Sequence, residues 1–163
     1  MIKGQDFTHF NEQGRGRMVD VTEKESTYRQ ATAAAKIFMK KETLQRIKDG
    51  GLVKGDVLGV AQVAGILGVK QTPYLIPMCH PLMISGVDLD FKFVESENCL
   101  EVLATVKVKG QTGVEMEALM AVSIASLTVY DMCKSIDKDI MISQICLLEK
   151  MGGKSGHYQR GEG

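Results

Sequence analysis

No tryptophan occurs in this 163-residue sequence, proline occurs only three times, and neither sign of charge is in excess. Lysine plus arginine equals aspartate plus glutamate, at 20 each. This balance excludes the global basic field with which proteins bind nucleic acid or anionic membranes. No apolar run reaches the roughly 20 residues that a membrane-spanning helix requires. We therefore expect neither nucleic acid nor a membrane as a partner, and an anionic ligand would need positive charge supplied locally.

The sequence also lacks the cysteine spacings that bind metals or build disulfide frameworks. Its four cysteines include no CxxC pair and follow no signal peptide: Cys79, Cys99, Cys133 and Cys146. We expect reduced thiols in a cytoplasmic protein. His80 follows Cys79, but no second histidine lies at ligand spacing, which argues against zinc. We expect no metal and no cofactor; a metal-dependent hydrolase using Cys79 and His80 is an alternative.

The length fits one domain. We expect a flexible arm at residues 1–17, a single α+β domain at 18–156 and a flexible tail at 157–163. The hydrophobic patterns predict a strand, two helices, a β-hairpin, a long helix and a strand, at residues 28–40, 42–50, 56–69, 87–110, 114–134 and 139–153. One antiparallel sheet covered on one face by helices is the simplest closure of this order, as in ferredoxin-like folds.

Residues 28–40 are the most ambiguous segment. Their alanines favour a helix, whereas their alternation with polar residues favours a half-buried strand. We prefer the strand. In the last predicted strand, alternate residues should share one face: Ile140, Ile142, Gln144, Cys146 and Leu148.

All three prolines lie within residues 73–85. Pro77 and Pro81 flank Met78-Cys79-His80, and proline both restricts its neighbours and removes amide donors. The segment is predicted to be a loop that cannot continue a helix and that holds His80 in a fixed direction. A single histidine is more often structural than catalytic, but this rigid setting favours a functional role.

Lys54 precedes Gly55 and a helix that Asp56 is expected to cap. It is either an exposed loop lysine or part of an anion site formed by the glycine and the helix start. The tail sequence GGKSG is no phosphate loop, because GxxxxGKS would need glycine at position 148, where leucine stands.

The long helix predicted at 114–134 is apolar almost all the way round, which is typical of burial on more than one side. The exceptions are Glu115 and Glu117 at its start and Asp131 and Lys134 at its end. Asp131 and Lys134 are three residues apart. They form either a helix-end ion pair or a carboxylate that tunes a proton-transferring lysine.

The two ends of this helix are too far apart to serve one small substrate. Glu117 and Asp131 point to nearly the same side, but the helical rise separates them by roughly 20 Å. If both ends are functional, a two-fold packing that brings the start of one helix near the end of its partner would join them. The spacing therefore predicts an oligomer with shared active sites.

Six segments, in this order, closely resemble one known family: MVDVT, KGDV, LIPMCHPL, TGVEMEAL, LTVYDMCK and GGKSG. From Met18 to Gly156 the chain is similar to the molybdenum-cofactor biosynthesis protein C (MoaC) family of cyclic pyranopterin monophosphate synthases. The resemblance implies a cytoplasmic catalytic domain, a lyase that converts (8S)-3',8-cyclo-7,8-dihydroguanosine 5'-triphosphate to cyclic pyranopterin monophosphate and releases pyrophosphate. It also implies a ferredoxin-like fold, a strand at 28–40, and a homohexamer of three dimers with interfacial sites.

The resemblance also implies the site residues. Those implied as catalytic are Asp131, Lys134 and Lys54. Those implied to bind substrate are Met78, Cys79, His80, Glu115, Met116, Glu117, Arg29 and Lys150. Crowded or partly desolvated lysines have lowered pKa values, so we expect Lys134 and Lys54 to transfer protons near neutral pH. The alternative is a non-catalytic nucleotide-binding oligomer, which would need neither the Asp131–Lys134 pair nor a fixed His80.

Overall fold

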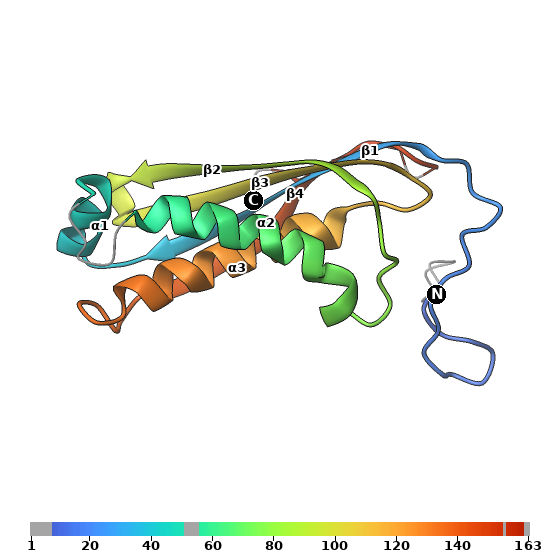
Figure 1. Ribbon diagram of the computed structural model, residues 1–163, viewed down its shortest axis with the longest axis horizontal. Helices are drawn as coiled ribbons and strands as arrows, with labels where there is room; N and C mark the ends of the chain where they lie inside the picture. Colours follow the sequence, from blue (N-terminus) through green and yellow to red (C-terminus); the bar gives the residue numbers. More distant parts are fainter. Residues whose placement is uncertain (1–7, 51–55, 155, 162–163) are drawn as a thin grey trace.

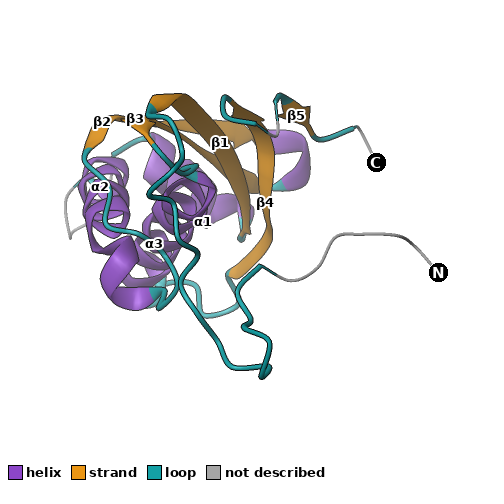
Figure 2. Cartoon of the chain, turned by 90° about the vertical axis from the view of Figure 1, so that its right-hand side faces the viewer, coloured by secondary structure: helices purple, strands orange, loops and turns teal. Residues whose placement is uncertain are grey.

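The computed structural model describes residues 8–50, 56–154 and 156–161, so Lys54 lies outside the described residues. The elements are β1 Thr27–Phe38, α1 Lys41–Lys48, α2 Val57–Leu75, β2 Ile84–Val94, the 3-10 turn η1 Glu95–Glu97, β3 Cys99–Gly110, α3 Glu115–Cys133, β4 Met141–Met151 and β5 Tyr158–Gln159. The strands form one antiparallel sheet in the order β2-β3-β1-β4-β5. Helices α2 and α3 lie side by side on one face of it (Figures 1 and 2). The predicted α+β class is confirmed.

Strand β1 occupies the middle of the sheet and settles the ambiguous segment as a strand. It pairs with β3 on one side and β4 on the other. Its alternate residues Ala31, Ala33, Ala35 and Ile37 are buried. Successive side chains of a strand point to opposite faces of the sheet, and most of the side chains on this face are the methyl groups of alanine. They leave room for α3, which contacts β1, β3 and β4.

Helix α2 differs from its prediction at its C-terminal end. Asp56 caps its start by accepting a hydrogen bond from the Gly59 amide at 2.9 Å, as expected. The helix then continues through Pro73 to Leu75, so the prediction that the loop begins at Pro73 was wrong. Proline removes only its own amide donor. The Thr72 hydroxyl still donates to the Gly68 carbonyl, and the Ile76 amide closes the last turn on Thr72.

Strand β4 also departs from its predicted alternation. Its pairing with β1 shifts register twice, and Gln144 adopts a positive φ of 51° at the first shift. A β-bulge places an extra residue in one strand and moves the following side chains to the other face. Ile142 and Leu147 therefore pack against the core, while Ile145 is exposed. The predicted single face that included Gln144 and Leu148 was wrong beyond the bulge.

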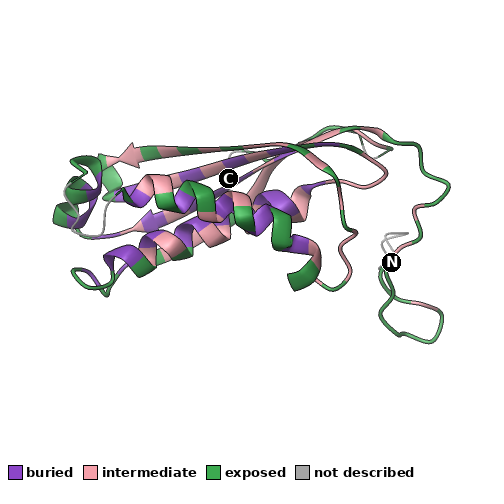
Figure 3. Ribbon diagram, in the orientation of Figure 1, coloured by how far each residue is buried: buried purple, intermediate pink, exposed green. Residues whose placement is uncertain are grey.

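Helix α3 is the element predicted from the apolar pattern at 114–134. Its length and composition would also suit a membrane-spanning helix, but half of that window is buried inside the domain. The buried stripe faces the sheet and α2, as the colouring by burial shows along the helix (Figure 3). Leu127 is the large apolar side chain that α3 exposes most.

Two glycines allow α2 and α3 to approach closely. A Cβ atom on Gly65 would lie 3.0 Å from the carbonyl oxygen of Ala121, and one on Gly68 would lie 2.9 Å from the Ile124 side chain. Both distances are below ordinary van der Waals contact. The helix pair therefore depends on the absence of side chains at these two positions.

Gly65→Ala tests this packing. Alanine favours a helix over glycine by up to about 1 kcal/mol, yet overpacking a close contact costs about 1–3 kcal/mol. We expect a net loss of unfolding free energy, measured by urea denaturation. The exposed Gln62→Ala on the same helix should stay near wild type. A Gly65→Ala protein more stable than wild type would contradict the close packing.

Candidate active site

A cavity of about 270 Å³ lies where the loop after α2 meets the start of α3. The loop contributes Met78, Cys79 and His80, and the first turn of α3 contributes Glu115, Met116 and Glu117. Segments of the N-terminal region, Val19 and Val21 among them, line the same cavity. Six residues implied as substrate contacts are therefore neighbours, although about 35 residues of sequence separate the two groups.

A larger hollow of about 790 Å³ shares part of its wall with this cavity. Lys24, Thr112, Gly113 and Glu115 line both. The larger hollow adds Arg29 and Lys150, the two remaining substrate-binding candidates. The two hollows thus form one cleft between the N-terminal region, the sheet and the start of α3, and this cleft gathers eight of the eleven predicted site residues.

Cations concentrate in the larger hollow although the chain is neutral. Its wall carries Arg29, Lys24, Lys150 and Lys154. The Arg29 guanidinium donates to the carbonyl oxygens of Gly110 and Gln111 at 2.9 and 3.1 Å, which fixes its plane. The Lys150 ammonium lies 3.6 Å from a Glu115 carboxylate oxygen. This arrangement supplies the local positive charge that an anionic ligand requires.

The glycine-rich tail shapes the same wall. Gly152 and Gly153 have φ angles of 93° and 74°, in the left-handed region that favours glycine. A Cβ on Gly153 would overlap the Arg29 guanidinium, and one on Gly152 would overlap the Tyr28 carbonyl. The two glycines therefore let the chain turn directly over Arg29 after Lys150.

Glu117 is the buried carboxyl of the smaller cavity, with only 3% of its surface exposed. Burial raises its pKa to about 7, and the nearby Glu115 charge adds to the increase, while a hydrogen bond from its own backbone amide opposes it. Burial and the Glu117 charge likewise raise the pKa of Cys79, so this thiol stays protonated. A carboxyl with a pKa near 7 can give or take a proton at neutral pH.

The sequence reasoning missed Asp20, a carboxylate that interacts electrostatically with His80. Asp20 accepts hydrogen bonds from the Thr22 hydroxyl and amide, and these bonds, with a smaller contribution from His80, lower the pKa of Asp20. Lys24 was missed as well, although it lines both hollows. Both residues lie in or beside the MVDVT segment. We used that segment only for its resemblance to a known family, although its charged side chains could have identified both residues as candidates.

Asp131 and Lys134 lie at the opposite end of α3, outside this cleft. The Lys134 ammonium donates to the Asp131 carboxylate at 2.6 Å, and the two side chains are 52% and 65% exposed. The hydrogen bond and charge of Asp131 raise the pKa of Lys134. The expectation of a lowered pKa for Lys134 is therefore wrong in the single chain, because the lysine is solvated and paired with an anion rather than crowded by cations.

Metal ligands do not cluster in the described part of the chain. Across 8–50, 56–154 and 156–161, no group of three or more histidine, cysteine, aspartate or glutamate side chains is placed to hold an ion.

These features define a class: an α+β protein with a cationic cleft, suited to a small anionic molecule, and one buried carboxyl, Glu117, in its wall. The chain belongs to the MoaC family, whose sequence pattern matches residues 18–153. It is similar to the cyclic pyranopterin monophosphate synthase of Clostridium acetobutylicum, with 58% identity over 154 residues, 94% of this chain and 96% of that one. The synthase of Thermoanaerobacter pseudethanolicus is 57% identical over 95% of this chain and 98% of its own. The one from Brevibacillus brevis is 59% identical over 96% and 97%.

Glu117 should make stability depend on pH. Because its pKa rises from 4.5 to about 7 on folding, the folded protein binds this proton more tightly than the unfolded chain. The unfolding free energy should therefore fall by up to about 3 kcal/mol as pH rises through this window. Glu117→Gln should lose this part of the dependence in urea titrations, whereas the exposed Glu42→Gln should keep it. Identical slopes for wild type and Glu117→Gln would refute the assignment.

Proposed function

We propose that this protein is a cyclic pyranopterin monophosphate synthase of molybdenum cofactor biosynthesis, a phosphorus–oxygen lyase. Its substrate is the cyclised dihydroguanosine triphosphate, and its products are cyclic pyranopterin monophosphate and pyrophosphate. The observation that carries the proposal is the convergence of eight side chains on one cationic cleft, in a chain 58% identical to the Clostridium acetobutylicum synthase. Residues 18–156 form the catalytic domain.

The two hollows of the cleft suit the two halves of this substrate. The triphosphate binds in the larger hollow, where Arg29, Lys150 and Lys24 offer positively charged donors. The guanine-derived ring binds in the smaller cavity, where Glu115 and Glu117 accept from its amino and ring N–H groups. Met78, Cys79, His80 and Met116 complete the wall around the ring.

The reaction needs proton transfer at several steps. In the closing step, a sugar hydroxyl gives its proton to a lysine that acts as general base, and its oxygen bonds to the α-phosphorus. The bond from that phosphorus to the bridging oxygen breaks, and pyrophosphate leaves with the electron pair. Asp131 holds Lys134 in its charged form, so we assign Lys134 as the proton donor, the general acid of the reaction. We assign the second proton-transferring lysine to Lys54, which lies outside the described residues.

The position of Asp131 and Lys134 requires a second subunit. They lie about 20 Å along α3 from Glu117, so one substrate cannot meet both ends of the same helix. Exposed apolar side chains on the helical layer offer a surface for another copy: Val60, Val63, Leu67 and Leu127. We propose a homohexamer built from three dimers, with each active site completed by a neighbouring chain. We propose a cytoplasmic location, without nucleic acid or membrane partners.

Mixing inactive variants tests the shared site. After subunit exchange, Asp131→Ala and Glu117→Ala proteins should recover up to about a quarter of wild-type turnover, because half of the two-fold interfaces are mixed and each contains one intact site. Asp131→Ala mixed with Lys134→Ala should recover nothing, since both residues come from the same end of one chain. Recovery in both mixtures, or in neither after proven exchange, would contradict the shared site.

Lys134→Ala tests the catalytic assignment. General acid–base catalysis contributes typically about 10²–10⁴-fold, so pterin formation should fall by that order while the oligomer persists. The assay incubates purified protein with the cyclised nucleotide and records pterin fluorescence after oxidation. Lys138→Ala, at an exposed lysine four residues further along the chain in the loop after α3, is the matched control. Turnover by Lys134→Ala equal to that of the control would remove the proposed acid. A wild-type protein that binds the nucleotide without converting it would favour the non-catalytic alternative.

A further inference from the structure

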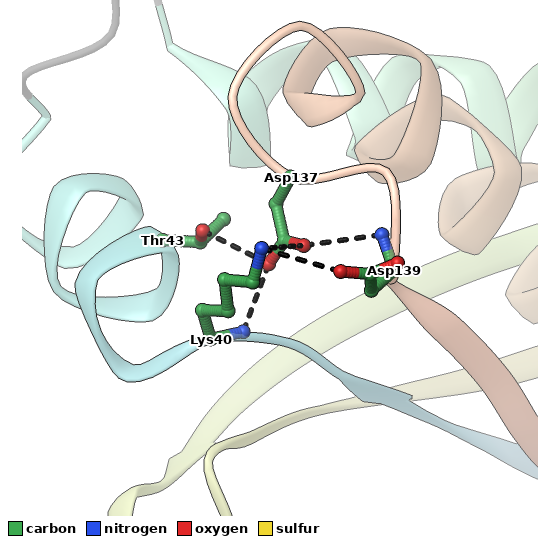
Figure 4. Close-up of polar contacts among 4 residues, drawn as sticks. All are labelled: Lys40, Thr43, Asp137 and Asp139. Atoms are coloured by element: carbon green, nitrogen blue, oxygen red, sulfur yellow. Dashed lines mark hydrogen bonds and ion pairs between the residues drawn. The ribbon is translucent and has the colours of Figure 1, made fainter.

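A second buried carboxyl lies near the other end of α3 and has no place in the proposed chemistry. Asp137, in the loop between α3 and β4, is only 1% exposed. One of its oxygens accepts from the Lys40 amide at 2.8 Å and from the Thr43 hydroxyl at 3.0 Å. The other accepts from the Asp139 amide at 3.2 Å and lies 3.7 Å from the Lys40 ammonium. Figure 4 shows these contacts converging on the carboxylate.

These contacts keep Asp137 charged. Burial alone would raise its pKa, but the bonds from the Lys40 amide, the Thr43 hydroxyl and the Asp139 amide, with the Lys40 charge, together lower it. A buried carboxylate with this many donors holds a fixed orientation, because any rotation leaves a donor or an oxygen without a partner. The side chain cannot reach a substrate, since none of it is exposed.

On one side the carboxylate is tied to the last turn of α3. The amides of Ile136 and Asp137 both donate to the Cys133 carbonyl, each at 3.0 Å, and the Lys134 amide donates to Tyr130 at 2.8 Å. The turn that carries Asp137 is therefore continuous with the helical turn that carries Lys134, only three residues earlier.

On the other side the carboxylate caps α1. Lys40, the residue before α1, makes no side-chain cap of its own, and Asp137 takes that role from a distant part of the chain. A negative charge at a helix N-terminus also interacts favourably with the helix dipole. The loop that follows α3 is thereby held against the start of α1. The last residue of α1, Lys48, precedes Lys54 by six positions in the sequence.

We propose that Asp137 is a positioning residue for Lys134. By fastening the turn after α3 to the start of α1, it fixes the direction in which the Asp131–Lys134 pair leaves the helix. This inference rests on the proposed role of Lys134 and adds to it a residue that never meets the substrate. The charge on Asp137 matters because a neutral side chain of the same shape cannot accept from donors at both oxygens.

Two pairs of variants test the proposal in the full-length enzyme. Asp137→Asn should lower kcat by about tenfold and leave KM within about twofold, because misdirection of a proton donor slows the chemical step. Thr43→Val, which removes one donor to the carboxylate, should lower kcat by about threefold, and Thr43→Ser should restore it. The double variant Asp137→Asn/Thr43→Val should be no slower than Asp137→Asn, because both changes break the same connection between Asp137 and the start of α1.

A stability control separates positioning from simple weakening. Val102→Ala removes buried side-chain volume from the core at β3, away from Asp137. It should keep the wild-type kcat per folded site even though its melting temperature falls about as much as that of Asp137→Asn. If Asp137→Asn and Thr43→Val match Val102→Ala in kcat while Lys134→Ala is inactive, the inference is overturned and the proposed function stands. If Lys134→Ala is active, the proposed role of Lys134 fails and the inference fails with it. If Asp137→Asn does not fold, the Thr43→Val and Thr43→Ser pair decides.

Discussion

The close packing of α3 on the central strand is the constraint on which the rest of the structure depends. A long apolar helix can lie this near a sheet and a second helix only where its neighbours carry small side chains. The alanines of β1 and the glycines of α2 provide that space. Once α3 is held along the sheet, its two ends are fixed at opposite sides of the domain. Its first turn then meets the proline-bounded loop, and the loop after its last turn is hydrogen-bonded to the start of α1.

The electrostatics of the molecule are local. A chain with no net charge builds a cationic wall by bringing together residues from β1, β4 and the N-terminal region. Arg29 is held by backbone carbonyls, whereas Lys150 is balanced by a carboxylate. Composition alone could exclude a global basic field, but only the antiparallel pairing of β1 with β4 places these cations beside the start of α3. The wall is therefore a property of topology rather than of composition.

Sequence reasoning predicted the order of the elements and the length of α3 from their hydrophobic periods. At β1 the alanine content and the alternation disagreed, and the strand was preferred with support from the resemblance. Sequence reasoning failed where a local feature of the backbone overrides the pattern of residues. Pro73 stays helical because its neighbours keep their hydrogen bonds, and a bulge at Gln144 reverses the faces of β4. The eight candidate residues that the structure brings together in one cleft were identified as a set by the resemblance and not by their spacing in the sequence. The charge of Asp20 could have marked it as a candidate, but its interaction with His80 could not be predicted, since nothing in the sequence relates an N-terminal segment to a loop sixty residues later.

The two buried carboxyls at the ends of α3 show how partners, rather than burial, determine what an acid can do. Glu117 and Asp137 are 3% and 1% exposed, so desolvation penalises both anions. Glu117 has a like charge nearby and a pKa of about 7. Asp137 has three hydrogen-bond donors, an ion pair with Lys40 and a pKa below the ordinary value. The first group can change its protonation state when a ligand enters, which suits recognition of a ring with exchangeable protons. The second cannot, which suits a fixed support. Because α3 separates them, these two kinds of carboxyl lie at opposite ends of the domain, and the shared site that we propose takes one end from each of two chains.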